Sequence, residues 1–394
     1  MTKILFLNYE YPPLGGGAAN ATAQLLQEYV SMADVEVHLV TSAQGSEKEE
    51  IHLGGRVYIH RLPIGKNPEK LHSQSLRDIV IYSVKALIFS WQLIKREEEH
   101  PFDATLAFFG VPCGFIALLL KWRSRLPYVV SLRGSDVPGY SAKYSALYLF
   151  IRPLIRLIWR EASAVVPNSQ GLKDLALVTA PKQPIDIIFN GVDTKRFFPA
   201  FEKRPSAEFI ITPGASRVTS RKGLRYLIEA VALLAPRFPQ LRLKIMGDSD
   251  GNERTLLDAI VKELHVEDKV VFIGRVPREA TVQYYQEASV FVLPSLNEGM
   301  SNALLEALAC GLPVIMTPTG GAAELIEEGK NGCIIPYRSG TAIAKMLETF
   351  LTQPEKVESY GLSSRERALQ MSWETVATHF LQVLQKASHN KDRL

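Results

Sequence analysis

The amino-acid sequence predicts an α/β protein of two doubly wound domains, each built on a parallel sheet. Apolar runs of strand length alternate with helical stretches along most of the 394 residues, which is typical of parallel sheets covered by helices on both faces. The alternation lapses once, at 198–206, where FPAFEKRPS carries two prolines and no periodicity. Because the pattern then resumes, we place a linker there and expect a separate core in each half.

The first domain, residues 1–199, begins with a strand directly at the N-terminus. Its strand runs are apolar on both faces, as in buried parallel strands. We expect strands at Lys3–Asn8, Val35–Thr41, Val57–Leu62, Thr105–Phe109, Tyr128–Leu132, Ala164–Pro167 and Ile185–Phe189, with helices at Ala18–Ser31, Leu76–Glu98, Pro112–Trp122, Ala142–Arg160 and from Gln170.

The second domain, residues 200–372, repeats the strand–helix alternation. A last helix, 373–390, is apolar at helical spacing and follows this domain, but we expect it to pack back on the first one. The expected strands are Phe209–Thr212, Leu241–Met246, Val270–Ile273, Val290–Leu293 and Val314–Met316, and the expected helices are Leu224–Leu234, Glu253–Leu264, Arg278–Glu287, Asn302–Ala309 and Ala322–Glu328.

Composition narrows the class of protein. Hydrophobic residues make up 46% and charged residues 22% of the chain, as in globular proteins that fold in water. Three cysteines without metal-ligand spacing are typical of a reducing compartment. The sequence shows no signal-peptide pattern and no apolar run near the roughly 18 residues of a spanning helix, so we expect a cytoplasmic protein.

Basic residues are concentrated in one part of the first domain. Between Lys121 and Arg160, eight basic residues stand against one acid, which favours an anionic partner. Arg152, Arg156 and Arg160 recur every fourth residue in the otherwise apolar helix 146–160. This pattern fits a helix on an anionic membrane surface, and it fits equally a core helix with one solvent-exposed face.

The stretch 293–320 is the strongest candidate for a ligand site. It reads as a strand end, a polar loop and a helix from Asn302, an arrangement that points backbone N–H groups at an anion. Glu298 in the loop and Glu306 in the helix could hold hydroxyl groups. A site that can bind an anion beside acids that can hold hydroxyl groups indicates a ligand with both phosphate and sugar, such as a sugar nucleotide. The spacing of the two acids alone is a weak signal.

Two further loops follow strands and could reach the same ligand. Gly15, Gly16 and Gly17 follow the first strand, where they could let the backbone approach a ligand or simply make a tight turn. Arg217 and Lys222 follow the first strand of the second domain and could neutralise a diphosphate without a metal. A solvated loop is the competing interpretation.

Arg133 and Asp136 follow the strand Tyr128–Leu132 in the segment RGSD. Asp136 could accept a proton or pair with Arg133, and an Asx-type turn explains it equally well. The eight histidines form no metal-ligand cluster, and motifs of metalloproteases, serine hydrolases, P-loop NTPases and dinucleotide-binding proteins are missing. We therefore expect no metal, no resident cofactor and no nucleic acid.

These motifs resemble the retaining family 4 glycosyltransferases of GT-B fold over essentially the whole chain. The most specific match is EGMSNALLE, from Glu298 to Glu306, which is similar to that family's E-x7-E motif. The glycine loop, NGVDTKRF from Asn190, the R-x4-K-G segment from Arg217 and TGGAAE support it. The resemblance implies two Rossmann-like domains, the first for an acceptor and the second for a nucleotide-sugar donor.

The resemblance also implies roles for individual residues. Arg217 and Lys222 would hold the donor diphosphate, Glu306 the ribose and Glu298 the transferred sugar. Glu298, Arg217 and Lys222 are thus the expected catalytic residues, with Arg133 and Asp136 beside them. The remaining donor contacts would come from Gly15, Gly16, Gly17, Gly274, Arg275, Val276, Gly299, Met300, Ser301 and Leu305.

The implied reaction is metal-independent hexosyl transfer from a UDP- or GDP-sugar, with retention at the anomeric carbon. The acceptor would be a glycan or a lipid-linked sugar, as in cell-surface polysaccharide or glycolipid synthesis. Arg133 departs from the family, since many members carry His there, and we expect it to contact donor phosphate or an anionic acceptor. A sugar-nucleotide 2-epimerase of the same fold and a non-catalytic sugar-nucleotide-binding protein are the alternatives.

Overall fold

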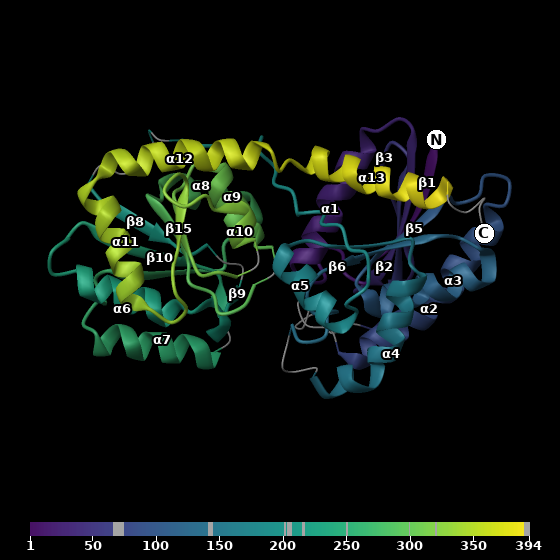
Figure 1. The fold of residues 1–394 in the computed structure, drawn as a ribbon, viewed down its shortest axis with the longest axis horizontal. Helices are drawn as coiled ribbons and strands as arrows, with labels where there is room; N and C mark the ends of the chain where they lie inside the picture. Colours follow the sequence, from purple (N-terminus) through teal and green to yellow (C-terminus); the bar gives the residue numbers. More distant parts are fainter. Residues whose placement is uncertain are drawn as a thin grey trace. The chain divides into compact units, whose positions relative to one another are not determined.

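The structure is a computed structural model that describes residues 1–65, 75–140, 145–200, 202, 207–214, 217–249, 251–298, 300–319 and 321–389. The chain forms two compact units (Figure 1). Unit 1 comprises Met1–Asn190 together with Trp373–Leu394, and unit 2 comprises Gly191–Ser372. Both are α/β units with parallel sheets, which confirms the predicted fold class.

Unit 1 is built on a seven-stranded sheet in the order β3-β4-β2-β1-β5-β6-β7. All neighbours are parallel except β3, which pairs antiparallel with β4 at one edge. The first strand is central and all six of its residues are buried, Thr2 and Lys3 included, so both of its faces are covered. The strands are β1 (Thr2–Leu7), β2 (Val35–Ala43), β3 (Glu49–Gly54), β4 (Val57–Pro63), β5 (Ala104–Phe108), β6 (Tyr128–Leu132) and β7 (Ala164–Pro167).

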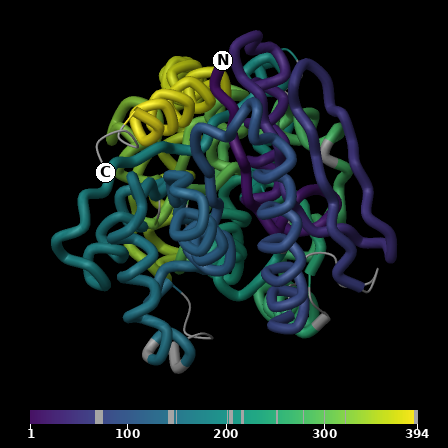
Figure 2. Tube along the Cα trace, turned by 90° about the vertical axis from the view of Figure 1, so that its right-hand side faces the viewer, coloured from purple at the N-terminus to yellow at the C-terminus, as the bar shows by residue number. Residues whose placement is uncertain are grey.

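Helices cover both faces of this sheet, with α1 and α13 on one face and α2, α3 and α4 on the other (Figure 1). The last helix, α13, supplies Phe380 and Leu384 to the core of unit 1. Its far end lies beside the start of β1, where Gln385 Nε2 donates to Thr2 Oγ1 at 3.0 Å (Figure 2). The helices are α1 (Gly17–Val30), α2 (Leu76–Arg96), the π-helical turn η2 (Gly110–Gly114), α3 (Phe115–Ser124), α4 (Ser145–Glu161), α5 (Gln170–Thr179) and α13 (Trp373–His389).

Unit 2 is built on a six-stranded parallel sheet in the order β12-β10-β8-β13-β14-β15, with a short separate pair β11-β9. The strands are β8 (Phe209–Thr212), β9 (Arg217–Val218), β10 (Leu241–Met246), β11 (Asp248–Ser249), β12 (Val270–Gly274), β13 (Val290–Leu293), β14 (Val314–Met316) and β15 (Gly332–Ile334). The helices are η5 (Ser220–Lys222), α6 (Leu224–Leu234), α7 (Gly251–Glu263), η6 (Arg278–Ala280), α8 (Thr281–Glu287), α9 (Asn302–Ala309), α10 (Ala322–Leu325), α11 (Gly340–Thr352) and α12 (Pro354–Leu369).

The division between the units lies before the proline-rich stretch in which we expected the linker. Residues from Gly191 onward belong to unit 2 because they pack there. The Phe197 and Tyr285 rings pack edge to face, with their centroids 6.1 Å apart. The Arg365 guanidinium donates to the carbonyl oxygens of Phe197 and Thr194.

The strand expected at Ile185–Phe189 is wrong, since the segment is irregular. The Ile188 N–H donates to the carbonyl oxygen of Pro167, the last residue of β7. The segment therefore runs past the end of the sheet and does not extend it. Within the described ranges, no helix combines the length and the hydropathy needed to cross a bilayer.

Candidate active site

The order of strands in unit 2 brings two loops together at one edge of the sheet. From β8 the chain builds outward through β10 to β12, then returns to the other side of β8 with β13 and continues outward to β15. Strands β8 and β13 pair directly, with Phe291 opposite Thr212. After β8 the chain continues toward β10, and after β13 it continues toward β14, in the opposite direction. The sheet edge between β8 and β13 is therefore a topological switch point, where ligands bind in open α/β sheets.

These two loops are in contact along their backbones. The Leu296 N–H donates to the Arg221 carbonyl oxygen at 2.7 Å. Gly223 has φ +64°, and a Cβ placed on it would lie 2.1 Å from the Pro294 carbonyl oxygen. Only glycine permits both the conformation and the close approach, so this residue fixes the position of the neighbouring Lys222.

Lys222 and Glu298 form the central pair of the site. The Lys222 Nζ donates to Glu298 Oε1, which also accepts from Ser295 Oγ at 3.2 Å. The side chains are 21% and 17% exposed, so each is oriented by protein and still reaches solvent. A lysine ammonium carries three donors, so Lys222 can bind Glu298 and an anion together. Arg221, the competing cation of the same turn, is exposed.

Helix α9 begins directly after this pair. Ser301 caps it by accepting from the Leu304 N–H at 3.4 Å, and the buried Leu305 anchors it in the core. Met300 is buried ahead of the cap. These contacts hold the helix N-terminus, which is the positive end of the helix dipole, beside the loop of Glu298.

Glu306 lies on the next turn of α9 and is held by a residue that the sequence did not reveal. Tyr285 of α8 donates its hydroxyl to Glu306 Oε2 at 3.3 Å. Burial, with the Glu306 carboxylate nearby, raises the pKa of Tyr285, so its hydroxyl remains a donor. A tyrosine inside an ordinary helical segment gives no sequence signal for this contact.

The remaining predicted donor residues of unit 2 lie at the same edge of the sheet or outside the described part. Gly274 ends β12 with φ +79°, and the exposed Arg275 and half-buried Val276 follow it. The backbone of Arg217 pairs with Asp248 in the β9-β11 pair, whereas its side chain and the whole of Gly299 lie outside the described residues.

Unit 1 has its own switch point, between β1 and β5, and the glycine loop follows β1 there. Gly15 has φ +93°, and a Cβ on it would lie 2.6 Å from Glu10 Oε2. The Gly16 N–H donates to that same oxygen at 3.4 Å, and Gly17 begins α1. Glu10, which the sequence did not single out, thus binds at the start of α1.

Arg133 follows β6 and is held between aromatic rings. Its Cζ lies 3.5 Å from the ring centroid of Phe108 and 5.8 Å from that of Phe380. Its Nη1 donates to Asn190 Oδ1 at 2.8 Å, and its buried Nε has no hydrogen-bond partner among the described residues. Burial lowers the pKa of Arg133 to about 9, which leaves it charged at neutral pH.

Asp136 is buried and accepts hydrogen bonds from backbone groups. Its Oδ1 accepts from the N–H groups of Arg133 at 2.9 Å and Gly134 at 3.0 Å, and its Oδ2 accepts from that of Gly110 at 2.7 Å. Burial raises the pKa of Asp136, and these hydrogen bonds oppose the rise. The carboxylate therefore closes the turn 133–136 from its C-terminal end and ties it to the loop after β5. This is not an Asx turn, in which the side chain would accept from the N–H group two residues further on.

Two of the three arginines of α4 bind the end of helix α5. Arg152 Nη2 donates to the Val178 carbonyl oxygen at 2.8 Å, and Arg156 Nε donates to that of Thr179 at 2.7 Å. Both carbonyls end α5, where cations are favoured by the helix dipole. Arg156 and Arg160 are exposed, and Arg152 is half-buried.

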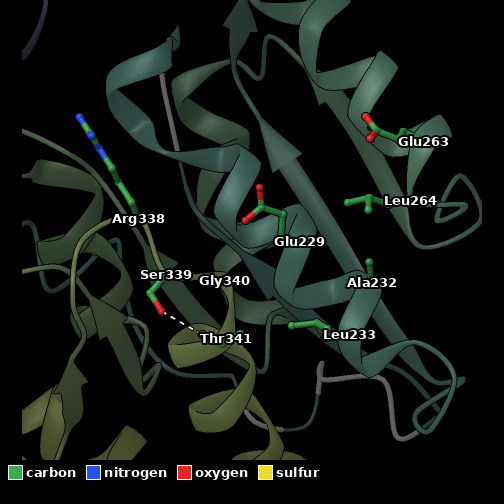
Figure 3. Close-up of a pocket in the computed structure, with 9 residues that line it drawn as sticks. All are labelled: Glu229, Ala232, Leu233, Glu263, Leu264, Arg338, Ser339, Gly340 and Thr341. Carbon is green, nitrogen blue, oxygen red and sulfur yellow. Dashed lines mark hydrogen bonds between the residues drawn. The ribbon is translucent and has the colours of Figure 1, made fainter.

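A cavity of about 680 Å³ in unit 2 is separate from these residues. It lies between α6, α7 and the start of α11, and Glu229, Glu263 and Arg338 are among the residues that line it (Figure 3). None of the predicted site residues lines it. In the described ranges, no group of His, Cys, Asp or Glu side chains is arranged to hold a metal ion.

Comparison with known proteins matches both units. Residues 16–191 match the model of the glycosyl transferase 4-like domain, and residues 194–367 match that of glycosyl transferases group 1. D-inositol 3-phosphate glycosyltransferase of Pseudarthrobacter chlorophenolicus is 31% identical over 390 residues, covering 93% of this chain and 90% of that protein.

Two solved structures share the fold. Sucrose-phosphate synthase of Thermosynechococcus elongatus has a TM-score of 0.82 at 22% identity and covers 98% of this chain and 99% of its own. Anabaena HepE, solved with UDP-glucose, has a TM-score of 0.74 at 19% identity and covers 98% and 100%. The chain therefore belongs to glycosyltransferase family 4, with the GT-B fold.

Proposed function

We propose that this glycosyltransferase moves a sugar from a UDP- or GDP-sugar to a hydroxyl group of a glycan or lipid-linked acceptor, without a metal and with retention. The Lys222–Glu298 pair at the switch point of unit 2 is the observation that carries this proposal. The HepE neighbour was solved with UDP-glucose, and the relative from Pseudarthrobacter is named for a phosphorylated acceptor. The first name supports a nucleotide-sugar donor, and the second supports glycosyl transfer without supporting a glycan or a lipid-linked acceptor in particular.

The donor half of the reaction requires stabilisation of the departing nucleoside diphosphate. Breaking the anomeric C–O bond places negative charge on the leaving phosphate while the sugar becomes oxocarbenium-like. Lys222, the N-terminus of α9 and, in the proposal, Arg217 would meet that charge. Glu298 would hold hydroxyls of the transferred sugar, and Glu306, oriented by Tyr285, would hold the ribose.

In the acceptor half, the incoming hydroxyl would attack on the face that the leaving phosphate departs from. That phosphate would take the hydroxyl proton, so no enzymatic nucleophile is needed. Arg133 would contact the donor phosphate or an anionic acceptor. If Arg133→Ala leaves kcat/KM unchanged for both donor and acceptor, this role is wrong.

We place this activity on the cytoplasmic side of the membrane, in the synthesis of cell-surface polysaccharide or glycolipid. Polyprenyl-linked and glycan acceptors both present a hydroxyl to a donor that is made in the cytoplasm.

The deciding experiment is a donor screen that follows nucleoside diphosphate release with and without polyprenyl-linked sugars, in the presence of EDTA. We expect one donor to be turned over only when an acceptor is added, at a rate that EDTA does not change. The product should keep the anomeric configuration of the donor by NMR. Release without acceptor, accompanied by an epimerised sugar, would identify an epimerase, and binding without release would identify a non-catalytic protein.

A further inference from the structure

The guanidinium group of Arg133 lies on an aromatic ring at the carboxyl edge of the unit 1 sheet. Phe108 ends β5 and Arg133 follows β6, so the two side chains come from neighbouring parallel strands. The Arg133 Cζ is 3.5 Å from the Phe108 ring centroid. Helix α13 packs against the same two strands (Figure 1) and supplies the Phe380 ring at 5.8 Å. An arginine stacked in this way keeps its N–H groups available for hydrogen bonds in its own plane.

The protein uses few of these N–H groups. An arginine side chain carries five N–H donors. In the described part of the chain, Nη1 of Arg133 donates to Asn190 Oδ1 at 2.8 Å, whereas the buried Nε has no partner. Buried donors of a charged group are costly to leave unpaired. The arrangement is therefore unfavourable for folding alone and points to a ligand.

The carboxylate nearest in sequence does not occupy this guanidinium. The charge of Asp136 acts on Arg133, but both of its oxygens accept from backbone N–H groups. Its Oδ1 accepts from those of Arg133 and Gly134, and its Oδ2 from that of Gly110. An incoming anion could thus pair with the guanidinium without displacing this carboxylate.

An unpaired hydrogen-bond acceptor lies on the next strand. Strands β6 and β7 are parallel, with Leu132 opposite Pro167, so Arg133 and Asn168 are the next residues along the two strands. Asn168 is 4% exposed, and its Oδ1 has no hydrogen-bond partner among the described residues. An amide oxygen accepts from a hydroxyl group. A ligand that carries an oxyanion and a hydroxyl group would therefore satisfy both side chains.

We propose that Arg133 and Asn168 form an acceptor subsite in unit 1, and that the acceptor carries a phosphate or carboxylate group beside a hydroxyl group. This assignment rests on the proposed transfer reaction. It gives Arg133 to the acceptor, because the donor diphosphate would be met in unit 2 by Lys222 and the N-terminus of α9. A polyprenyl diphosphate sugar would present the phosphate, and a glycan with a uronic acid would present the carboxylate.

The test is equilibrium binding of three small probes to the full chain without donor, measured by ligand-observed NMR. Glucose 6-phosphate, glucuronate and glucose share a hydroxylated ring and differ in charge. We expect the native protein to bind at least one of the two anions about 30-fold more tightly than glucose, as a buried charge pair does. Preference for glucose 6-phosphate would indicate a phosphorylated acceptor, and preference for glucuronate would indicate an acidic glycan.

Substitutions locate the bound anion. Arg133→Gln should abolish the preference over glucose. Arg133→Lys should keep part of it, because the charge remains without the planar fork of donors. Asn168→Asp should also abolish it, since a carboxylate on the next strand would take the place of the anion. Arg160→Gln removes an exposed arginine of the same unit and should bind the probes as the native protein does.

Two results would overturn the subsite. One is the absence of any preference for the anions in the native protein. The other is a preference that Lys222→Ala abolishes and Arg133→Gln leaves intact, which would place the anion in unit 2. Circular dichroism checks the folding of each variant, and Asn168→Asp supplies the same test if Arg133→Gln does not fold. Release of nucleoside diphosphate is measured separately, so failure of this subsite is distinguishable from failure of the proposed transfer reaction.

Discussion

At the scale of single residues, the proposed donor site centres on one lysine whose position is fixed by its neighbour. Lys222 lies between Gly223, which approaches the Pro294 carbonyl oxygen, and the Glu298 carboxylate. Preorganised charge of this kind is worth most where negative charge develops during the reaction. Its removal should therefore affect the chemical step more than donor binding.

We expect Lys222→Ala to lower kcat by about 10²- to 10³-fold, as loss of one preorganised donor does. The measurement is steady-state release of nucleoside diphosphate under saturating acceptor. Arg221→Ala is the matched control, because this exposed cation belongs to the same turn and should lower kcat less than about threefold. Equal losses in both variants would mean that the turn supplies only diffuse positive charge.

The sequence predicted that the loops after β8 and β13 carry the candidate donor residues, but not how these residues are held. Lys222 and Glu298 could be selected because each follows an apolar strand. Their contact could not be predicted, since the pairing of β8 with β13 depends on the order of strands in the sheet. Arg133 shows the same limit, because its partner Phe380 is far away in the sequence and comes from the last helix.

At the scale of elements, the close contact between the loops after β8 and β13 gives a prediction about glycine. Gly223→Ala would force a side chain into a left-handed conformation at a cost of about 1–3 kcal/mol and would also drive its Cβ toward Pro294. We expect a lower midpoint of urea unfolding for unit 2 and reduced donor turnover. In Gly171→Ala the new methyl group meets open space, so this control should fold at least as stably as the native protein.

A pair of buried histidines joins β2 to β4 and makes the edge of unit 1 sensitive to pH. His38 Nδ1 and His60 Nε2 are 3.0 Å apart, and Glu36 and Glu50 lie beside them. Burial lowers the pKa of His38. Burial and the neighbouring His38 lower the pKa of His60 from 6.5 to about 4.

The unfolded chain therefore takes up these protons before the folded chain does as the pH falls. The free energy of unfolding should be highest above pH 6.5 and should fall as the pH is lowered toward 4. The loss should be about 3 kcal/mol for His60 alone. Urea unfolding at pH 7 and pH 5 measures this, and His60→Gln should reduce the difference. His52→Gln changes an exposed histidine of β3 and should leave the difference as it is; an unchanged difference in His60→Gln would contradict the prediction.

Elements were predicted best where the chain is apolar on both faces. Strand β1 lies close to its expected bounds because its six residues are all buried. Strand β3, EEIHLG, was missed because it is an exposed edge strand with two leading glutamates. The strand expected at Ile185–Phe189 has enough apolar residues, but the sheet ends at β7.

At the scale of the whole molecule, the two units are joined by a chain that leaves unit 1 at Asn190 and returns to it with α13. Helix α13 contributes buried side chains to unit 1, and the Phe380 ring lies 6.0 Å from that of Phe108. The stability of unit 1 should therefore depend on residues that follow unit 2 in the sequence.

We expect Phe380→Ala to destabilise unit 1 by about 3–5 kcal/mol, the cost of removing a buried phenylalanine. Urea unfolding should then show unit 1 melting earlier while the transition of unit 2 stays in place. Leu362→Ala, which changes a half-exposed side chain of α12, should shift neither transition by more than about 0.5 kcal/mol. A shift of both transitions by Phe380→Ala would mean that the units unfold together.

The return of α13 also determines the order in which the protein can fold as it is made. Ribosomes release the chain from its N-terminus, so the strands of unit 1 emerge first. Phe380 and Leu384 of its core emerge only after all of Gly191–Ser372 has been synthesised. Unit 2, although second in the sequence, is thus the first to have its complete set of residues outside the ribosome. Until the ribosome has released α13, the part of the unit 1 sheet that this helix covers is exposed.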